Sequence, residues 1–493
     1  MESLVTLPKQ STSHLKAEFS DLPSELIIDI LSQIKRKRDL LNVSLTCKAF
    51  SKLAEPFIYR QYRNVHVLSE WISFRPFLRR IISRPDLAAH IKLVELRSWT
   101  TRLRGPYEDE QMSQDDLSTF LVAAQQARLI ENIVTPVVLN FPDSDDEWDD
   151  EEDDAQDDFE GMTFDERFCT ALDLAIEDVQ VVLLLSLLPN VEEIILRYLP
   201  WDHLPWDCLA GTTHGFQCLR RLSIKINPLA SWQPARIAPV LCLPSLRVLE
   251  GSGFYRPNET DSSWSFPPRS LALTKIHLEI CSIGILNLKS LLQGCKNLES
   301  FYYHTLGHPN EYITYARMSD TLQCQKPSLK HLSLTFNSAS QDIFGSLAEF
   351  NHLASLQMEA RMLFSLQPVI KASQPNITNL TQSLHDLLPA SLEKLVLDIS
   401  GWSSSDFYSR IGIHLPALSN AHLYHDLLPR LKTVVMFPPS SIPQSTIKKL
   451  QLSFRLAGVE LSFTNNCLLT PENREMYKGW TYPLDGSPPR RIG

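Results

Sequence analysis

The chain has 493 residues, of which 43% are hydrophobic and 21% are charged. This composition can build sizeable cores and excludes a wholly disordered chain. Leucine occurs 76 times against only 16 glycines, which argues against glycine-loop nucleotide folds and for a helical or repeat architecture built on leucine. The formal charge is −10, but residues 143–160 alone hold 13 acidic and no basic side chains, so the other 44 acidic and 47 basic residues sum to +3.

Several features of the chain predict a protein of a reducing compartment, cytoplasmic and/or nuclear, without a membrane partner. The nine cysteines are scattered and form no Cys-x-x-Cys pair, which indicates free thiols. The polar residues 1–19 contain no apolar signal segment, and we expect them to be a disordered lead. The longest apolar run, Val179–Leu188, is about half of what a bilayer span needs.

A compact helical pattern covers residues 20–64. Apolar side chains recur in its first helix with the i, i+3, i+4, i+7 spacing of one helical face, at Ile27, Ile30, Leu31 and Ile34. Leu22, Leu26 and Ile28 widen this face. A unit of about 45 residues cannot bury so much apolar surface internally, so the sequence predicts a partner that covers it. The following run Lys35–Arg38 is a weak match to a nuclear-import signal, and a solvated interhelical loop is the favoured interpretation.

The apolar positions of this segment follow a known order. They read Leu22-Pro23-x-Glu25-Leu26, Ile30-Leu31, Asp39-Leu40-Leu41 and Leu45-x-Cys47-Lys48-x-Phe50. This pattern resembles the F-box motif, with Thr46 where the family usually has Val and Phe50 where it often has Trp. The resemblance implies docking onto the Skp adaptor of a cullin–RING ubiquitin ligase. The adaptor-binding residues that it implies are Leu22, Pro23, Glu25, Leu26, Ile30, Leu31, Leu40, Leu45 and Phe50, with Glu25 holding the first turn. A helical bundle that packs on the chain's own following domain is the alternative.

Residues 65–140 are a mixed connecting region that could hold the first irregular repeats. The pattern predicts a helix over 71–84, a strand over 90–97 and a helix over 115–133. The acidic stretch 141–161 follows, and the self-repulsion of its charges predicts a disordered insertion.

A degenerate repeat then decides the predicted architecture. The pattern L-x-x-L-x-L recurs nine times, with one partial copy at Leu246 and Leu249, and successive copies begin 28, 27, 27, 25, 31, 24, 39 and 39 residues apart. The first residues of the copies are Val191, Leu219, Leu246, Leu273, Leu298, Leu329, Leu353, Leu392 and Leu431. Leucine-rich repeats have periods of about 20–29 residues, so most intervals fit and the last two require loop insertions.

The longer motif L-x-x-L-x-L-x-x-N/C-x-L is complete at Leu219, with Asn227, and at Leu273, with Cys281, and extends to Asn337 in the copy at Leu329. A buried Asn or Cys at this point can satisfy backbone groups that the turn leaves unpaired. The predicted fold is therefore α/β overall, with a small all-α F-box helical domain followed by a leucine-rich-repeat-like solenoid over 162–465 and a tail over 466–493. A leucine-rich helical array that matches the repeat by chance is the alternative.

No catalytic signature was found, and neither a cofactor nor a metal is expected. The Walker, dinucleotide-binding, zincin and nucleophile-elbow motifs are all absent from the sequence. His277 with Cys281, and His304 with His308, have metal-like spacing, but each is a lone pair in a repeat and a structural role is favoured. Nucleic-acid binding is not expected either, because no domain is strongly basic.

The repeats also carry candidate target-binding residues. Arg220, Arg221, Lys225, Lys275 and Lys330 occupy non-leucine positions of their copies and could form a basic row that recognises an acidic or phosphorylated segment. Solvated side chains that keep the sheet soluble are the favoured alternative. The predicted function is a substrate-recognition subunit of an SCF-type ubiquitin ligase, which binds the Skp adaptor and cullin at one end and an unknown protein substrate at the other. The alternative is a repeat scaffold that binds the Skp adaptor for a non-degradative role.

Overall fold

The computed structural model describes residues 22–64, 74–97, 112–137, 161–199, 215–226, 237–256, 264–305, 313–336, 342–363, 387–399, 428–437 and 443–464, together with strands at 480–481 and 490–491. The predicted disordered lead and the acidic run 143–160 lie outside these residues, as does most of the predicted tail.

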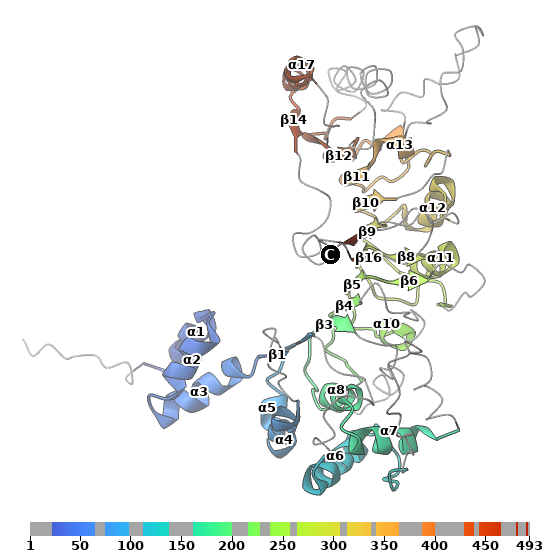
Figure 1. The fold of residues 1–493 in the computed structure, drawn as a ribbon. Coiled ribbons are helices and arrows are strands. Elements are labelled where there is room, and N and C mark those ends of the chain that lie inside the picture. The colour runs from blue at the N-terminus through green and yellow to red at the C-terminus, as the bar shows by residue number, and fades with distance from the viewer. Residues whose placement is uncertain are drawn as a thin grey trace, which may run out of the picture.

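Three short helices open the described chain, as the sequence pattern predicts: α1 (Ser24–Gln33), α2 (Lys37–Ser44) and α3 (Lys48–Ile58). Helix α2 begins at Lys37, so half of the basic run Lys35–Arg38, predicted to be an interhelical loop, belongs to the helix. Pro56 is accommodated inside α3. Figure 1 shows these helices projecting to one side of the remaining structure.

The rest of the chain builds one long open sheet of 12 parallel strands, which adjoin in chain order. Its strands are β1 (Gln61–Asn64), β2 (Leu93–Arg97), β3 (Glu193–Leu199), β4 (Arg221–Ile226), β5 (Val248–Ser252), β7 (Lys275–Glu279), β9 (Ser300–His304), β10 (His331–Thr335), β11 (Ser355–Glu359), β12 (Lys394–Asp398), β13 (Thr433–Phe437) and β14 (Glu460–Phe463). Two further pairs are separate from it: β6 (Tyr255–Arg256) with β8 (Ser282–Ile283), and β15 (Trp480–Thr481) with β16 (Arg490–Arg491).

Helices connect the strands and lie along the sheet (Figure 1). They are α4 (Arg75–Ser83), α5 (Pro85–Ala88), α6 (Gln114–Gln126), α7 (Phe164–Asp173), α8 (Glu177–Ser186), α10 (Ala238–Leu241), α11 (Ile285–Gly294), α12 (Tyr315–Leu322), the 3-10 helix η4 (Gln323–Gln325), α13 (Ala360–Leu363) and α17 (Gln444–Leu456). Consecutive parallel strands joined by helical crossovers form the α/β solenoid that the repeats predict.

The leucine positions of the repeats form the core between sheet and helices. Leu222, Leu249, Ile276 and Phe301 are register partners on consecutive strands, and all four are completely buried. The leucine-type positions of all nine copies are buried. Side chains alternate along a strand, so the intervening residues lie on the opposite side of the sheet. We call that side the open face.

The sheet begins earlier than the repeat pattern indicated. Strand β2 pairs with β3, and the residues Ile91, Val94 and Leu96 before and within it are buried in the spacing of a further copy. Strand β1 pairs with β2 and follows α3 after two residues. The solenoid therefore starts at Gln61 rather than at residue 162, and the connecting region 65–140 holds its first repeats.

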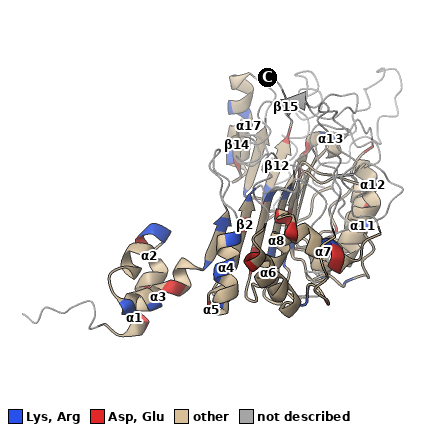
Figure 2. Cartoon of the chain, turned by 60° about the horizontal axis from the view of Figure 1, so that its bottom comes forward, with Lys and Arg blue, Asp and Glu red and all other residues tan. Residues whose placement is uncertain are grey.

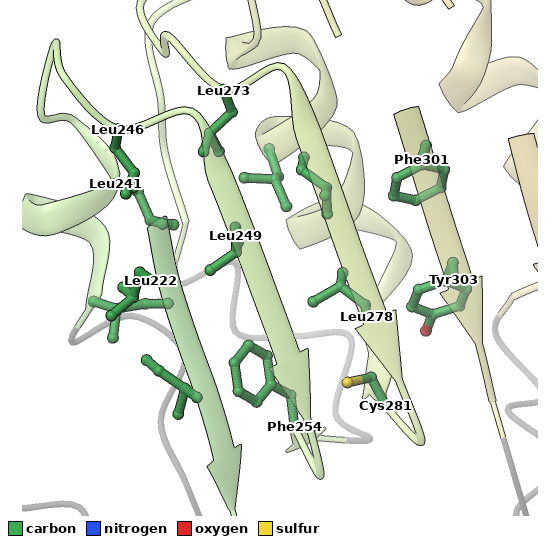
Figure 3. Close-up of a cluster of buried hydrophobic side chains, with 14 of the residues drawn as sticks. Leu222, Leu241, Leu246, Leu249, Phe254, Leu273, Leu278, Cys281, Phe301 and Tyr303 are labelled. Atoms are coloured by element: carbon green, nitrogen blue, oxygen red, sulfur yellow. The ribbon is translucent and has the colours of Figure 1, made fainter. Parts of the chain in front are cut away.

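The partial copy at Leu246 has a packing explanation. The third leucine position is Gly251, and a Cβ there would lie 2.5 Å from Cε2 of Phe254 and 2.9 Å from Cδ2 of Leu278. The fully buried Phe254 ring from the following turn fills this space in the cluster (Figure 3). An aromatic side chain outside the motif thus replaces the missing leucine.

Cys281 plays the structural role that the longer motif predicts. Its buried thiol donates to the carbonyl oxygens of Gly251, at 3.7 Å, and Glu279, at 3.3 Å. Burial raises the pKa of Cys281 to about 12, so the thiol stays protonated and can donate these hydrogen bonds. Asn227 and Asn337 lie outside the described residues.

Candidate functional site

The three N-terminal helices have a small core of their own, separate from the core of the sheet. Its fully buried side chains are Ile27, Leu31, Leu40, Ala54 and Ile58. Partly buried residues pack against this cluster, and Leu22 and Phe50 are among them.

Local backbone contacts fix where these helices begin. The Pro23 carbonyl accepts hydrogen bonds from the amides of Leu26, at 3.1 Å, and Ile27, at 3.2 Å. Glu25 is exposed in the first turn, where its charge complements the helix dipole. Cys47 precedes α3, and its sulfur accepts from the amide of Phe50 at 3.5 Å. Cys47 had no predicted role, and its position three residues before that amide is the signal for a helix cap.

Large apolar side chains are concentrated on the surface of the same helices. Five of the twelve exposed large hydrophobic residues in the described chain belong to residues 22–64: Leu26, Ile28, Ile30, Leu41 and Leu45. Leu45 is 83% exposed. We call these five residues the apolar patch. Exposed large apolar side chains in this number on three short helices are candidates for an interaction surface. Leu26 and Ile30 lie one turn apart on α1, whereas Ile28 lies about 200° around the helix from both.

The predicted adaptor-binding residues divide into three groups, of which the first is the partly buried pair Leu22 and Phe50. Leu26, Ile30 and Leu45 belong to the apolar patch, and Pro23 and Glu25 are also exposed. Leu31 and Leu40 are in the helical core instead, so in this conformation they support the patch and do not form part of it. Ile28 and Leu41 were not among the predicted residues, although Leu41 is part of the F-box-like pattern and Ile28 belongs to the widened apolar face of the first helix.

The predicted basic residues occupy three levels of the solenoid sheet. Arg221 and Lys275 lie at one level, separated by Val248 on the intervening strand. Arg220 and Lys330 precede their strands, at the next level. Lys225 lies further along β4 and is the register partner of Arg197 and Ser252.

Glutamates on neighbouring strands neutralise much of this row. Arg221 contacts Glu250 at 2.8 Å and Glu193 at 3.6 Å. Lys275 lies 4.0 Å from Glu250, and Lys330 forms an ion pair with Glu299 at 2.8 Å. Arg220 is exposed and makes no ion pair with a residue that the structure describes. The row therefore carries less net positive charge than its lysines and arginines alone suggest.

Both the helical domain and the repeats match known protein families. Residues 19–64 match the F-box-like family, and residues 235–406 match the leucine-rich repeat domain family. The chain is an F-box protein with leucine-rich repeats. No curated protein matches it.

In this F-box protein the sheet extends beyond the matched repeats on both sides, from β1 to β14. The copies nearest the F-box are divergent, and α6, α7 and α8 lie between β2 and β3. The F-box indicates binding of a Skp-type adaptor in SCF complexes, the role typical of F-box proteins.

His304 and Cys281, two of the residues with metal-like spacing, have structural roles in the described chain. His304 Nε2 lies 2.8 Å from the Ser333 hydroxyl inside the sheet, and Cys281 is bonded to backbone. His308 is outside the described residues. Within the described ranges no three His, Cys, Asp or Glu side chains are grouped to hold a metal ion.

A hollow of about 380 Å³ lies between α4 and α6. None of the residues that line it is ionisable: Ile82, Ser118, Thr119, Val122, Ala123 and Gln126.

No helix in the described part of the chain has the length and apolarity to cross a bilayer.

Proposed function

We propose that this F-box protein is a substrate-recognition subunit of an SCF-type ubiquitin ligase. The observation that carries the proposal is the apolar patch on helices that already have a complete core. Burying apolar surface stabilises a complex by about 25 cal/mol per Å², so a patch of several leucines and isoleucines is well suited to bind an adaptor.

Backbone hydrogen bonds and an ion pair connect the F-box to the start of the sheet. The Arg60 carbonyl accepts hydrogen bonds from the amides of Lys92, at 2.9 Å, and Leu93, at 3.2 Å, at the start of β2. The Arg84 guanidinium also contacts Glu55 of α3 at 3.2 Å. These contacts link α3 directly to the first repeats.

This connection suits a subunit that acts through proximity. A target on the open face would be held at a defined position relative to the adaptor, which raises its effective concentration near the loaded ubiquitin. The subunit itself would perform no chemistry, because ubiquitin transfer belongs to other components of the ligase.

Affinity purification of the full chain with the proteasome blocked tests the proposal. We expect the Skp adaptor and the cullin in the purified complex, together with proteins that accumulate only when degradation is blocked. Adaptor without cullin would favour the non-degradative scaffold, and the absence of both would contradict the proposal.

A further inference from the structure

Three arginines surround a single buried carboxylate at the end of the open face nearest the F-box. Glu95 of β2 is almost fully buried. Its carboxylate lies 3.0 Å from Arg97, 3.1 Å from Arg197 of β3 and 3.5 Å from Arg63 of β1. We call these four residues the arginine cluster. Three guanidinium groups against one carboxylate give the cluster a net charge of +2.

Two of the three arginines of the cluster are accessible. The side chain of Arg63 is 50% exposed and that of Arg97 is 39% exposed. Arg97 donates from both Nε and Nη2 to the same oxygen of Glu95, which fixes the plane of its guanidinium. Cations held in place in this way lose little entropy when an anion binds.

The cluster continues as a row of cations across the sheet. Arg97, Arg197 and Lys225 are register partners on β2, β3 and β4. Adjacent strands are about 4.8 Å apart, so the three positions span about 10 Å. Figure 2 shows Lys and Arg positions, in blue, on the strands around β2.

The cations at this level are confined to one end of the sheet. Ser252 of β5 and Glu279 of β7 follow Lys225, and Glu359 of β11 is paired with Asp398 of β12. None of these four residues is a cation, so an anionic segment would find its cations at the β1–β4 end.

We propose that the arginine cluster and Lys225 bind a carboxylate-rich segment of the target protein. This inference rests on the proposed function, in which the repeats recruit a target. Side chains two residues apart in an extended segment point to the same side and are about 7 Å apart. Two such carboxylates therefore fit along a row of cations about 10 Å long. A single phosphate holds all its oxygens on one atom and could face only part of that row. The charge of the row therefore favours a run of Asp or Glu over one phosphorylated residue.

Fluorescence anisotropy on the full chain in complex with the Skp adaptor tests the inference. The probe is a labelled 12-residue peptide with Glu at alternate positions. One comparison peptide has Gln at those positions, and a second has Gln with a single phosphoserine. We expect the Glu peptide to bind and the Arg63→Gln, Arg97→Gln variant to bind it at least tenfold more weakly. The matched control Arg80→Gln, Lys449→Gln removes two exposed cations from α4 and α17 and should bind like the unmodified protein.

The chain's own acidic run 143–160 could compete with the probe, so a variant without these residues is measured in parallel. Binding that depends on Arg63 and Arg97 in either background supports the inference. Equal binding of the Glu and Gln peptides, tighter binding of the phosphoserine peptide, or no effect of the arginine substitutions would overturn it. Adaptor binding is measured in the same samples and reports separately on the proposed function, because the F-box residues are unchanged.

Discussion

Ile30 and Leu31 are neighbours on α1, yet 42% of Ile30 is exposed whereas only 1% of Leu31 is. Leu31 packs against Leu40 and Ala54 in the core of the F-box, and Ile30 is part of the apolar patch. Two adjacent apolar residues therefore have separable roles, one in folding and one on the surface proposed to bind the adaptor.

The double substitution Leu26→Ala, Ile30→Ala should weaken adaptor binding without unfolding the F-box. Interface hot spots cost about 2 kcal/mol or more when truncated, which corresponds to a loss of roughly 30-fold in affinity. Calorimetric titration with the purified adaptor measures the effect. Leu452→Ala, Leu456→Ala on α17 is the matched control, since both leucines are exposed far from the F-box in sequence. Equal affinity for all three proteins would exclude α1 from the interface.

Leu31→Ala should instead destabilise the F-box. Truncating a buried leucine costs about 2–5 kcal/mol, a large part of the stability available to a core this small. We expect an unfolding transition of the F-box at lower urea concentration, monitored by circular dichroism, while the transition of the solenoid is retained. The companion variant Ile30→Ala should unfold as the unmodified protein does, and a similar loss in both variants would argue against the separation of roles.

Much of the fold could be predicted because the repeats obey strict periodicity. A residue such as Leu222 must face the helices if Leu219 and Ile224 do, and the register of the sheet aligns it with its equivalents. The copy at Ile91 was not recognised as a repeat because a long segment containing α6, α7 and α8 separates it from Val191. Gly251 also looked like an interruption, since no pattern shows that Phe254 folds back to fill its place.

The sites were harder to predict, because exposure and charge pairing depend on contacts between elements. The apolar spacing of α1 does not reveal that α3 covers Leu31 and leaves Ile30 exposed. Lys330 looked like a free cation in its own repeat, whereas the structure places Glu299 of the preceding repeat against it. Glu95 and Arg197 are about a hundred residues apart, so only the pairing of β2 with β3 brings them together.

Gly251→Ala should destabilise the solenoid. The added methyl group would lie closer to both Phe254 and Leu278 than van der Waals contact allows, and overpacking of this kind costs about 1–3 kcal/mol. Thermal unfolding followed by calorimetry measures the loss. Adding Phe254→Leu makes room for the methyl group, so part of the stability should return. A Gly251→Ala protein as stable as the original would contradict the packing explanation of the partial repeat.

His304 should make the solenoid sensitive to acid. Burial, with a smaller effect of the His277 charge, lowers the pKa of His304 to about 3, whereas an unfolded histidine has a pKa of about 6.5. Between these values the unfolded chain takes up a proton that the folded chain does not, so stability falls as the pH decreases through this window. His304→Asn should reduce the slope of the unfolding free energy against pH between 6.5 and 4, measured by urea denaturation. An unchanged slope would assign the acid sensitivity to other groups.

Size-exclusion chromatography with light scattering on the purified full chain, Skp adaptor and cullin tests assembly of the ligase directly. We expect the three proteins to elute together with one copy of each, and Leu26→Ala, Ile30→Ala to remove both partners at once because the cullin is reached only through the adaptor. Separate elution of the unmodified chain, or a complex that the double variant leaves intact, would contradict the proposed function.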